Sequence, residues 1–359
     1  MLRKTFQLLA IFCSLAWVHS AHAITVTMDT QSAKAALEAL NDPALTHDEA
    51  IKVAKMTGNQ GTIRKLNEFK IPATTETFAS ALYAAAHGKK VTDPAETNFF
   101  FDVVKSKDAQ LLELVKTIDT NPEAFQSDIK KRIAMFTPSN ADISLHGYVV
   151  AAGDGGGYAF GDTDFYLNVG IIDELVVAKT VATHELYHAV QGAYVKDRDI
   201  PKVAMSNASC ASTAKLFANL YEEGTAVYVE DISLLATSRS ASGMRQEADL
   251  TDGIKQVRWS SALLEISIAA LTAHHAVPYD KVYGVGFYGH AILYNIAYVM
   301  AKAIVDNGGP QALTKLLKEP SYEFILQYAQ LPRYGADEDH PKLGPNTIEM
   351  ANTLATGCK

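Results

Sequence analysis

The segment His184-Glu185-Leu186-Tyr187-His188 constrains the fold of this chain more than any other stretch of its sequence. On an α-helix, residues four apart lie on one face with Cβ atoms about 6 Å apart, so His184 and His188 can reach one metal ion. A tetrahedral Zn²⁺ binds imidazole nitrogens at about 2.0–2.1 Å. The segment therefore predicts a helix that carries two ligands of a single zinc ion.

Glu185 follows His184 directly, which turns its side chain about 100° around the helix and toward the open position of the metal. There it would hold the zinc-bound water and take its proton. Zinc lowers the pKa of such a water to about 7, and the carboxylate then makes it a usable nucleophile against an amide carbonyl. We therefore predict that Glu185 is a catalytic general base.

The alternative is a surface helix with two unrelated histidines. The surrounding sequence argues against it, because apolar residues recur at helical spacing and indicate a buried face. Paired histidines on a half-buried helix need a compensating partner, and a metal ion is the obvious one. The apolar positions are Leu175, Val176, Val181, Ala182, Leu186 and Val190.

A zinc site also needs a third protein ligand, and residues 220–230 supply a candidate in Glu223. The 34 residues between His188 and Glu223 leave room for the first helix to end and a second helix to return. Two histidines and one glutamate leave the fourth position open for water, as in a catalytic zinc site.

The pattern His184-Glu185-x-x-His188 followed by Glu223-Gly224-x-Ala226-x-Tyr228-x-Glu230 resembles the gluzincin metallopeptidases, including their aminopeptidase branch and poorly characterised exported bacterial peptidases of that clan. The resemblance implies a zincin fold in which Glu223 is the ligand, on a helix antiparallel to the first, with Glu222 as the fallback. It extends in weaker form to residues 157–160 and 283–287 and covers roughly residues 142–330.

One departure from the family concerns the partners of the ligands. The thermolysin type has an aspartate four positions after its glutamate ligand, bonded to a histidine ligand, and here that position is Val227. Metal-bound histidines usually donate their other N–H to a carboxylate or carbonyl. Glu230 is a candidate substitute, and the alternative is that Glu230 is a solvated helix residue.

Hydrolysis of an amide builds negative charge on oxygen, and by resemblance a tyrosine or histidine helps to stabilise it. Tyr283 is the first choice, with Tyr288 and His290 behind it, at the start of a predicted long apolar helix that runs to about residue 305. The alternative for each of these residues is that it belongs to the hydrophobic core.

The first residues are typical of an export signal, with Arg3 and Lys4 ahead of an apolar run at residues 8–18 and the small-residue site Ala21-His22-Ala23. The run is shorter than the roughly 20 residues that span a bilayer, so a membrane anchor is the weaker alternative. We expect cleavage after Ala23, no membrane span in the mature chain, and a periplasmic or secreted location.

Loss of Arg3 and Lys4 would leave 30 of the 32 basic residues against 40 acidic ones, a formal net charge of −10. This charge disfavours nucleic acid and anionic membranes as partners. The predicted zinc chemistry and the gluzincin resemblance lead us to expect a peptide or protein substrate. The mature chain keeps Cys210 and Cys358 in a compartment that permits disulfides. We predict that they pair, the alternative being two separate thiols.

The remaining pattern predicts an α+β fold that is predominantly helical. Helices are expected at residues 33–40, 46–55, 75–87, 97–118 and 122–135, and short strands at 144–151 and 164–169. Residues 164–168 could bind peptide by strand addition or belong to an ordinary hairpin. We predict a signal peptide at 1–23, an N-terminal helical region at 24–140, and a zincin-like metallopeptidase domain at 141–359, with a small sheet, the active-site helix and a helical subdomain.

Together these features predict an exported zinc metallopeptidase with one Zn²⁺. Endopeptidase action is slightly favoured over aminopeptidase action, because no segment upstream of the zinc helix supplies an acidic anchor for a free amine. The alternative from another class is a non-hydrolytic protein that keeps the fold and binds peptide or envelope partners, and an intact Glu185 argues against it. The sequence does not indicate which substrate side chains the protein prefers or what its oligomeric state is.

Overall fold

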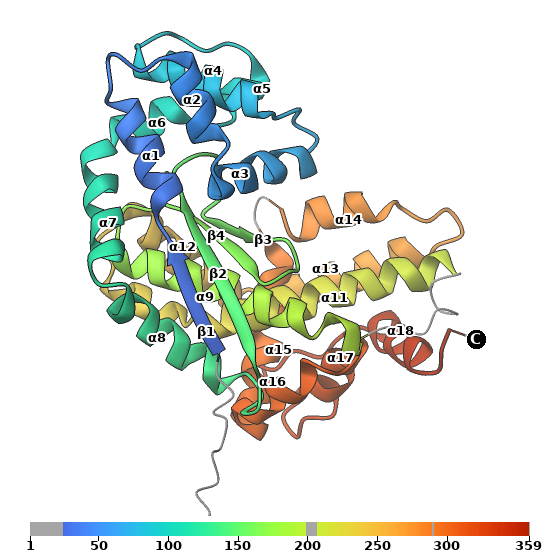
Figure 1. Ribbon diagram of the computed structural model, residues 1–359. Helices are drawn as coiled ribbons and strands as arrows, with labels where there is room; N and C mark the ends of the chain where they lie inside the picture. The colour runs from blue at the N-terminus through green and yellow to red at the C-terminus, as the bar shows by residue number, and fades with distance from the viewer. Residues whose placement is uncertain (1–23, 199–206, 289–290, 359) are drawn as a thin grey trace, which may run out of the picture.

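The computed structural model describes residues 24–198, 207–288 and 291–358, with a four-stranded sheet between the N-terminal and C-terminal helices (Figure 1). The strands are β1 (Ile24–Asp29), β2 (Ile143–Val150), β3 (Gly157–Ala159) and β4 (Asp164–Asn168). Their order is β1-β2-β4-β3, in which β2 pairs with β1 and β4 in parallel, and β3 pairs with β4 antiparallel. The predicted export signal lies outside the described residues.

The two predicted strands are present as β2 and β4, whereas β1 and β3 were not anticipated. Strand β4 is hydrogen-bonded on both sides, to β2 and to β3. The suggestion that residues 164–168 add a substrate strand is therefore wrong, because β4 has no free edge. Within the described chain the outer edge on this side of the sheet belongs to β3.

A run of helices separates β1 from β2 (Figure 1). The predicted helix at 97–118 is divided into α5, α6 and α7, because Phe100 before α6 has a left-handed backbone with φ of 55° and Lys107 before α7 departs from helical geometry. Helix α3 was missed because its glycines disfavour helix. A Cβ at Gly61 would lie 2.0 Å from the Tyr166 ring, so close packing on β4 explains that glycine. The helices are α1 (Gln31–Leu40), α2 (His47–Ala54), α3 (Thr57–Glu68), α4 (Thr75–Ala86), α5 (Pro94–Thr97), α6 (Phe101–Ser106), α7 (Asp108–Thr120) and α8 (Pro122–Met135).

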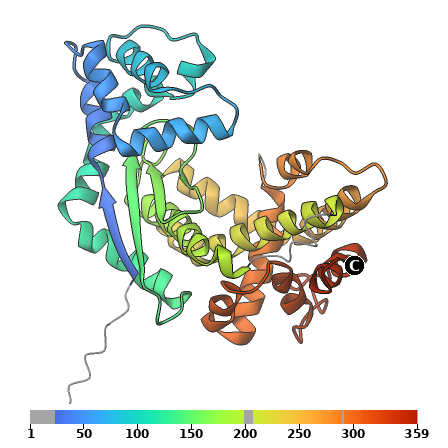
Figure 2. The same cartoon turned by 45° about the vertical axis from the view of Figure 1, so that its right-hand side comes forward.

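The part of the chain after β4 is helical, and Figure 2 shows α11 running from beside the sheet into the C-terminal helices. The predicted single helix from about residue 279 to 305 is two helices, α14 and α15, and Ala291 before α15 has a left-handed backbone with φ of 49°. The elements are α9 (Leu175–Ala193), η1 (Val195–Arg198), α11 (Ala208–Val229), η2 (Ile232–Thr237), α12 (Ala241–Lys255), α13 (Val257–Thr272), α14 (Tyr279–Gly286), α15 (Ile292–Gly308), α16 (Pro310–Leu316), α17 (Tyr322–Ala329) and α18 (Pro345–Ala355).

The α+β, predominantly helical fold class is confirmed by this architecture. One cluster of buried apolar side chains extends from Ile24 in β1 to Leu354 in α18. The boundary at residue 140 stays a prediction, and β1 from the segment before it pairs with β2 from the segment after it. Among the described residues, no helix is long and apolar enough to cross a membrane.

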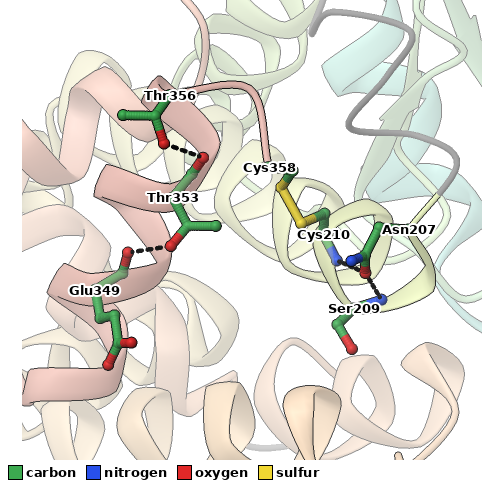
Figure 3. The surroundings of a disulfide bond; sticks show 7 residues. All are labelled: Asn207, Ser209, Cys210, Glu349, Thr353, Thr356 and Cys358. Atoms are coloured by element: carbon green, nitrogen blue, oxygen red, sulfur yellow. Dashed lines mark hydrogen bonds between the residues drawn. A yellow bond between two sulfur atoms is a disulfide. The ribbon is translucent and has the colours of Figure 1, made fainter.

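The disulfide between Cys210 and Cys358 is present, which confirms the predicted pairing (Figure 3). Cys210 lies in the first turn of α11, where the Asn207 side chain accepts hydrogen bonds from the backbone N–H groups of Ser209 and Cys210. Cys358 lies just after α18. The bond therefore joins the start of the second predicted ligand helix to the end of the described chain.

Candidate metal centre

Helix α9 carries His184, Glu185 and His188, as the spacing predicted. The helix packs on β3 and β4 with one face and on α11 with another. Both imidazoles are largely shielded from solvent, and Glu185 is buried. The Nε2 atoms of His184 and His188 lie 3.0 Å apart. The two rings therefore converge on one point beside the helix.

Helix α11 brings Glu223 to the same point. Its Oε2 atom lies 3.4 Å from the Nε2 atom of His184 and 3.4 Å from that of His188. Ligand atoms around a tetrahedral zinc at about 2.0–2.1 Å are roughly 3.3–3.4 Å from one another. His184, His188 and Glu223 therefore form a group that could hold a metal ion. Among the described residues the fallback ligand Glu222 is not part of such a group.

Glu230 is the outer partner of His184. Its side chain is 4% exposed, and its Oε2 atom lies 2.8 Å from the Nδ1 atom of His184. The imidazole can thus donate its Nδ1–H to this carboxylate and direct Nε2 at the ligand cluster. The alternative that Glu230 is a solvated helix residue is wrong, because α11 turns it toward α9 instead of toward solvent.

Gln191 is the outer partner of His188, a role that was not predicted from the sequence. Its Oε1 atom lies 2.7 Å from the Nδ1 atom of His188, and its Nε2 donates to the Glu222 backbone oxygen at 2.9 Å and to the Thr225 hydroxyl at 2.8 Å. Gln191 is 1% exposed. One amide therefore orients a ligand on α9 and ties it to the segment of α11 that carries Glu223. Its position three residues after His188 was the available sequence signal.

The charged groups of the cluster shift one another's proton equilibria. Burial acts to lower the pKa of His184, but hydrogen bonds with Glu223 and Glu230 outweigh it and raise that pKa well above its usual value. Burial acts to raise the pKa of Glu223, but the neighbouring histidines hold it well below its ordinary range. Burial raises the pKa of Glu185. Paired carboxylates and imidazoles enclosed in this way suit a bound cation.

Glu185 lies against β3. A Cβ on Gly157 would come within 2.5 Å of the Glu185 Cγ atom, so the strand can approach the carboxylate this closely only with glycine at that position. The Glu185 side chain lines a pocket together with His184 and Gly157. It therefore faces the space where a substrate would lie beside the ligand cluster.

The structure does not link Tyr283, the residue predicted to stabilise the oxyanion, directly to the ligand cluster. Tyr283 lies on α14 with its ring stacked on Phe287, 5.5 Å between centroids, and makes no hydrogen bond with the ligand cluster among the described residues. Tyr288 is 64% exposed. His290 lies outside the described residues. The assignment of Tyr283 stays a prediction.

Tyr294 on α15 was not anticipated. Burial of its hydroxyl, together with the nearby negative charge of Glu223, raises the pKa of Tyr294 well above its usual value. Tyr294 also lines the pocket that contains Glu185. No sequence signal links it to the cluster, because only the packing of α15 on α11 brings it there.

Two hollows flank the ligand cluster. The first, of about 320 Å³, contains His184 and Glu185, and the second, of about 190 Å³, contains His188 and Glu223. Strand β3 contributes Gly157 to the first hollow, and Ala159 to the second. An extended chain along the free edge of β3 would therefore pass both hollows and cross the cluster.

The donor set by itself defines a class of protein. Two imidazoles and a carboxylate with ligand atoms 3.0–3.4 Å apart, and a second carboxylate beside a pocket, are the arrangement of a zinc-dependent hydrolase. A family model described as "Putative zinc dependent peptidase" (DUF5700) matches residues 50–334, and the chain belongs to this family. No curated protein and no solved structure matches the chain.

Proposed function

We propose that this chain is an exported zinc peptidase of the gluzincin type, in which His184, His188 and Glu223 hold one zinc ion. The observation that carries the proposal is the spacing of the three ligand atoms at 3.0, 3.4 and 3.4 Å. Membership of a zinc-dependent peptidase family supports the metal and the hydrolase class. Glu185 is the general base of the proposed reaction.

The reaction is the addition of water to a peptide bond. When bound, zinc supplies a Lewis acid that polarises the carbonyl and makes a neighbouring water easier to deprotonate. Glu185 takes a proton from the attacking water while the water oxygen bonds to the carbonyl carbon. The proton then passes to the amide nitrogen, the C–N bond breaks, and the products are a carboxylate and an amine.

A hydroxyl group beside the cluster assists this step. Tyr294 lines the pocket that contains Glu185, and its buried hydroxyl lies near the Glu223 charge, so its O–H can donate to the carbonyl oxygen as negative charge develops there. Tyr283 on α14 is the second candidate for this role. Replacing each with phenylalanine distinguishes them, since only the donor's variant should lower kcat.

The substrate lies along β3 as an added strand. The free edge of β3 presents backbone groups that can pair with an extended peptide. Hollows on both sides of the cluster give room for residues before and after the scissile bond, which supports endopeptidase action. A peptide blocked at both ends should be cleaved as well as its free counterpart.

The substitution Glu185→Gln tests the mechanism. The variant should bind zinc like the parent but lose about 10²–10⁴-fold or more in kcat, because the amide cannot take the proton. Hydrolysis of a denatured protein mixture and the metal content of purified protein are the two measurements. Cleavage by the variant at the parental rate would refute the role of Glu185.

Glu223→Ala is the matching test of the metal centre. It should release zinc, and stoichiometric zinc in the variant would move the third ligand to Glu222 or elsewhere. The rival function is a binding protein that retains the fold without hydrolysis. Proteolysis that a zinc chelator stops and added zinc restores would exclude that rival, and no proteolysis by the zinc-loaded parent would favour it.

Export is the remaining part of the proposal and rests on the segment from Arg3 to Ala23. A protein recovered outside the cytoplasm should begin at Ile24. An intact first residue in the mature protein would contradict the proposed cleavage.

A further inference from the structure

The first hollow beside the ligand cluster, here called the Asp249 pocket, joins the catalytic groups to helices α12 and α15. Its volume of about 320 Å³ lies at the lower end of the range for small-molecule sites, so it has room for one long side chain. Its lining includes Gly157 of β3, His184 and Glu185 of α9, Asp249 of α12 and Tyr294 of α15.

The walls of the Asp249 pocket are aliphatic. Val181 from α9, Val227 from α11, Ile232 from η2 and Leu250 from α12 contribute to them. Val227 occupies the position at which the thermolysin type has an aspartate, so here that position is part of a wall. A side chain with a long apolar stem would therefore bury the stem against these groups.

The charge on the pocket is negative. Three carboxylates line it, from Glu185, Glu230 and Asp249, and none of its lining residues is lysine or arginine. Glu230 is already engaged by His184 and by Gln246, whose Nε2 lies 3.5 Å from Oε1. Even with a divalent ion on the cluster, these three groups and Glu223 would leave a net charge of about −2, counting one negative charge for each.

Asp249 is the carboxylate left for a ligand. It is exposed on α12, and among the described residues it forms no hydrogen bond or ion pair through its side chain. An aliphatic wall that ends at an exposed carboxylate suits a side chain that is apolar along its length and cationic at its tip. Lysine and arginine have this form, and their charged ends can stay in contact with water.

The direction of β3 determines which substrate residue enters the pocket. Strand β3 runs from Gly157 at the Asp249 pocket to Ala159 at the second hollow. The proposed substrate strand pairs antiparallel to β3, because antiparallel pairing is slightly more stable per residue than parallel pairing. It therefore runs the other way, from the second hollow to the Asp249 pocket. The residue that enters the Asp249 pocket therefore follows the scissile bond.

We infer that the Asp249 pocket selects lysine or arginine at the first position after the scissile bond and rejects aspartate and glutamate there. This inference rests on the proposed peptidase function and names its substrate class. The Asp249 carboxylate provides the selection by pairing with the cationic tip, and the aliphatic walls provide affinity for the stem.

The first experiment maps cleavage sites of the zinc-loaded protein in a peptide library of random sequence. The expected result is enrichment of lysine and arginine immediately after the cleaved bond, and depletion of acidic residues there. Efficient cleavage with apolar residues or no preference at that position would overturn the inference while leaving the peptidase function intact. Absence of any zinc-dependent cleavage would instead refute the function, and the inference with it.

The second experiment compares two peptides that differ only by lysine or methionine after the scissile bond. Asp249→Asn should lower the lysine-to-methionine ratio of kcat/KM about two- to fivefold, the range for an exposed ion pair. Asp249→Lys should lower it further and make a glutamate peptide the better substrate. An unchanged ratio in both folded variants would overturn the assignment of Asp249.

Glu247→Gln is the matched control, because Glu247 lies on the same helix outside the pocket lining and loses the same charge. The lysine-to-methionine ratio of kcat/KM for Glu247→Gln should equal that of the parent. A drop as large as that of Asp249→Asn would show a general effect of net charge and would refute a specific pocket.

Discussion

At the scale of single residues, the two histidines of the candidate metal centre have outer partners of different chemistry. His184 bonds to the carboxylate of Glu230, whereas His188 bonds to the amide of Gln191. A carboxylate makes the imidazole a more basic ligand, and an amide only orients it. The two positions should therefore differ in how strongly they affect the metal.

Gln191→Leu should weaken zinc binding about 10- to 100-fold, because His188 loses the acceptor that orients its ring. Competition with a chelator measures the affinity, and circular dichroism checks that the variant is folded. Gln191→Glu keeps an acceptor for His188 and should lose less zinc affinity than Gln191→Leu. Parental zinc affinity in Gln191→Leu would show that Gln191 only links the two helices.

The sequence predicted His184, Glu185 and His188 from spacing alone, because i and i+4 positions on a helix meet without help from the rest of the fold. Glu223 needed a family resemblance, since nothing local distinguishes it from Glu222. Tyr294 could not be predicted from the sequence, because its approach to Glu223 depends on how α15 packs on α11.

At the scale of secondary-structure elements, the contact between α11 and α15 brings residues of the candidate site together. A Cβ at Gly224 would lie 2.5–2.7 Å from Cβ, C and O of Ala297, and backbone atoms cannot move aside as a flexible side chain can. The glycine next to Glu223 therefore permits the helix approach that places Tyr294 beside it. This is the physical reason for a Glu-Gly pair in this helix.

Gly224→Ala should lower the free energy of unfolding by about 1–3 kcal/mol, because α15 must shift to admit the methyl group. Urea denaturation measures this change. Gly284→Ala on α14 is the control, since a Cβ there meets no atom within 4 Å and alanine favours helix by up to about 1 kcal/mol. Equal stability of the two variants would contradict the role of helix approach.

Most elements were predictable and their interruptions were not. Hydrophobic periodicity predicted the long helices but not their breaks. The break at Phe100 is a left-handed residue with no adjacent glycine or proline, and the break before the left-handed Ala291 was missed although Gly286 and Gly289 precede it. Helix α3 was missed for the opposite reason, because Gly58 and Gly61 suggest a break where packing requires them. Local propensity is outweighed at these positions by tertiary contacts.

At the scale of the whole molecule, the disulfide links residues 148 apart and attaches the C-terminal end to the ligand helix α11. Closure of so long a loop restricts the unfolded chain, so Cys358→Ser should lower the free energy of unfolding by about 2–5 kcal/mol. Urea denaturation with and without reductant measures it. Reductant should destabilise the parent but leave the variant unchanged, and a parent insensitive to reductant would refute the stabilising role.

The sequence by itself determined the zinc helix, the class of chemistry and the predominantly helical fold, because these depend on residue types at short, regular spacing. Only the tertiary structure decided that Glu230 and Gln191 orient the ligands, that Tyr294 and Asp249 face the site, and that β3 forms the free edge. The reason is geometric. Those relations join residues on separate elements, and their distances are set by the packing of the helices and by the order of the strands.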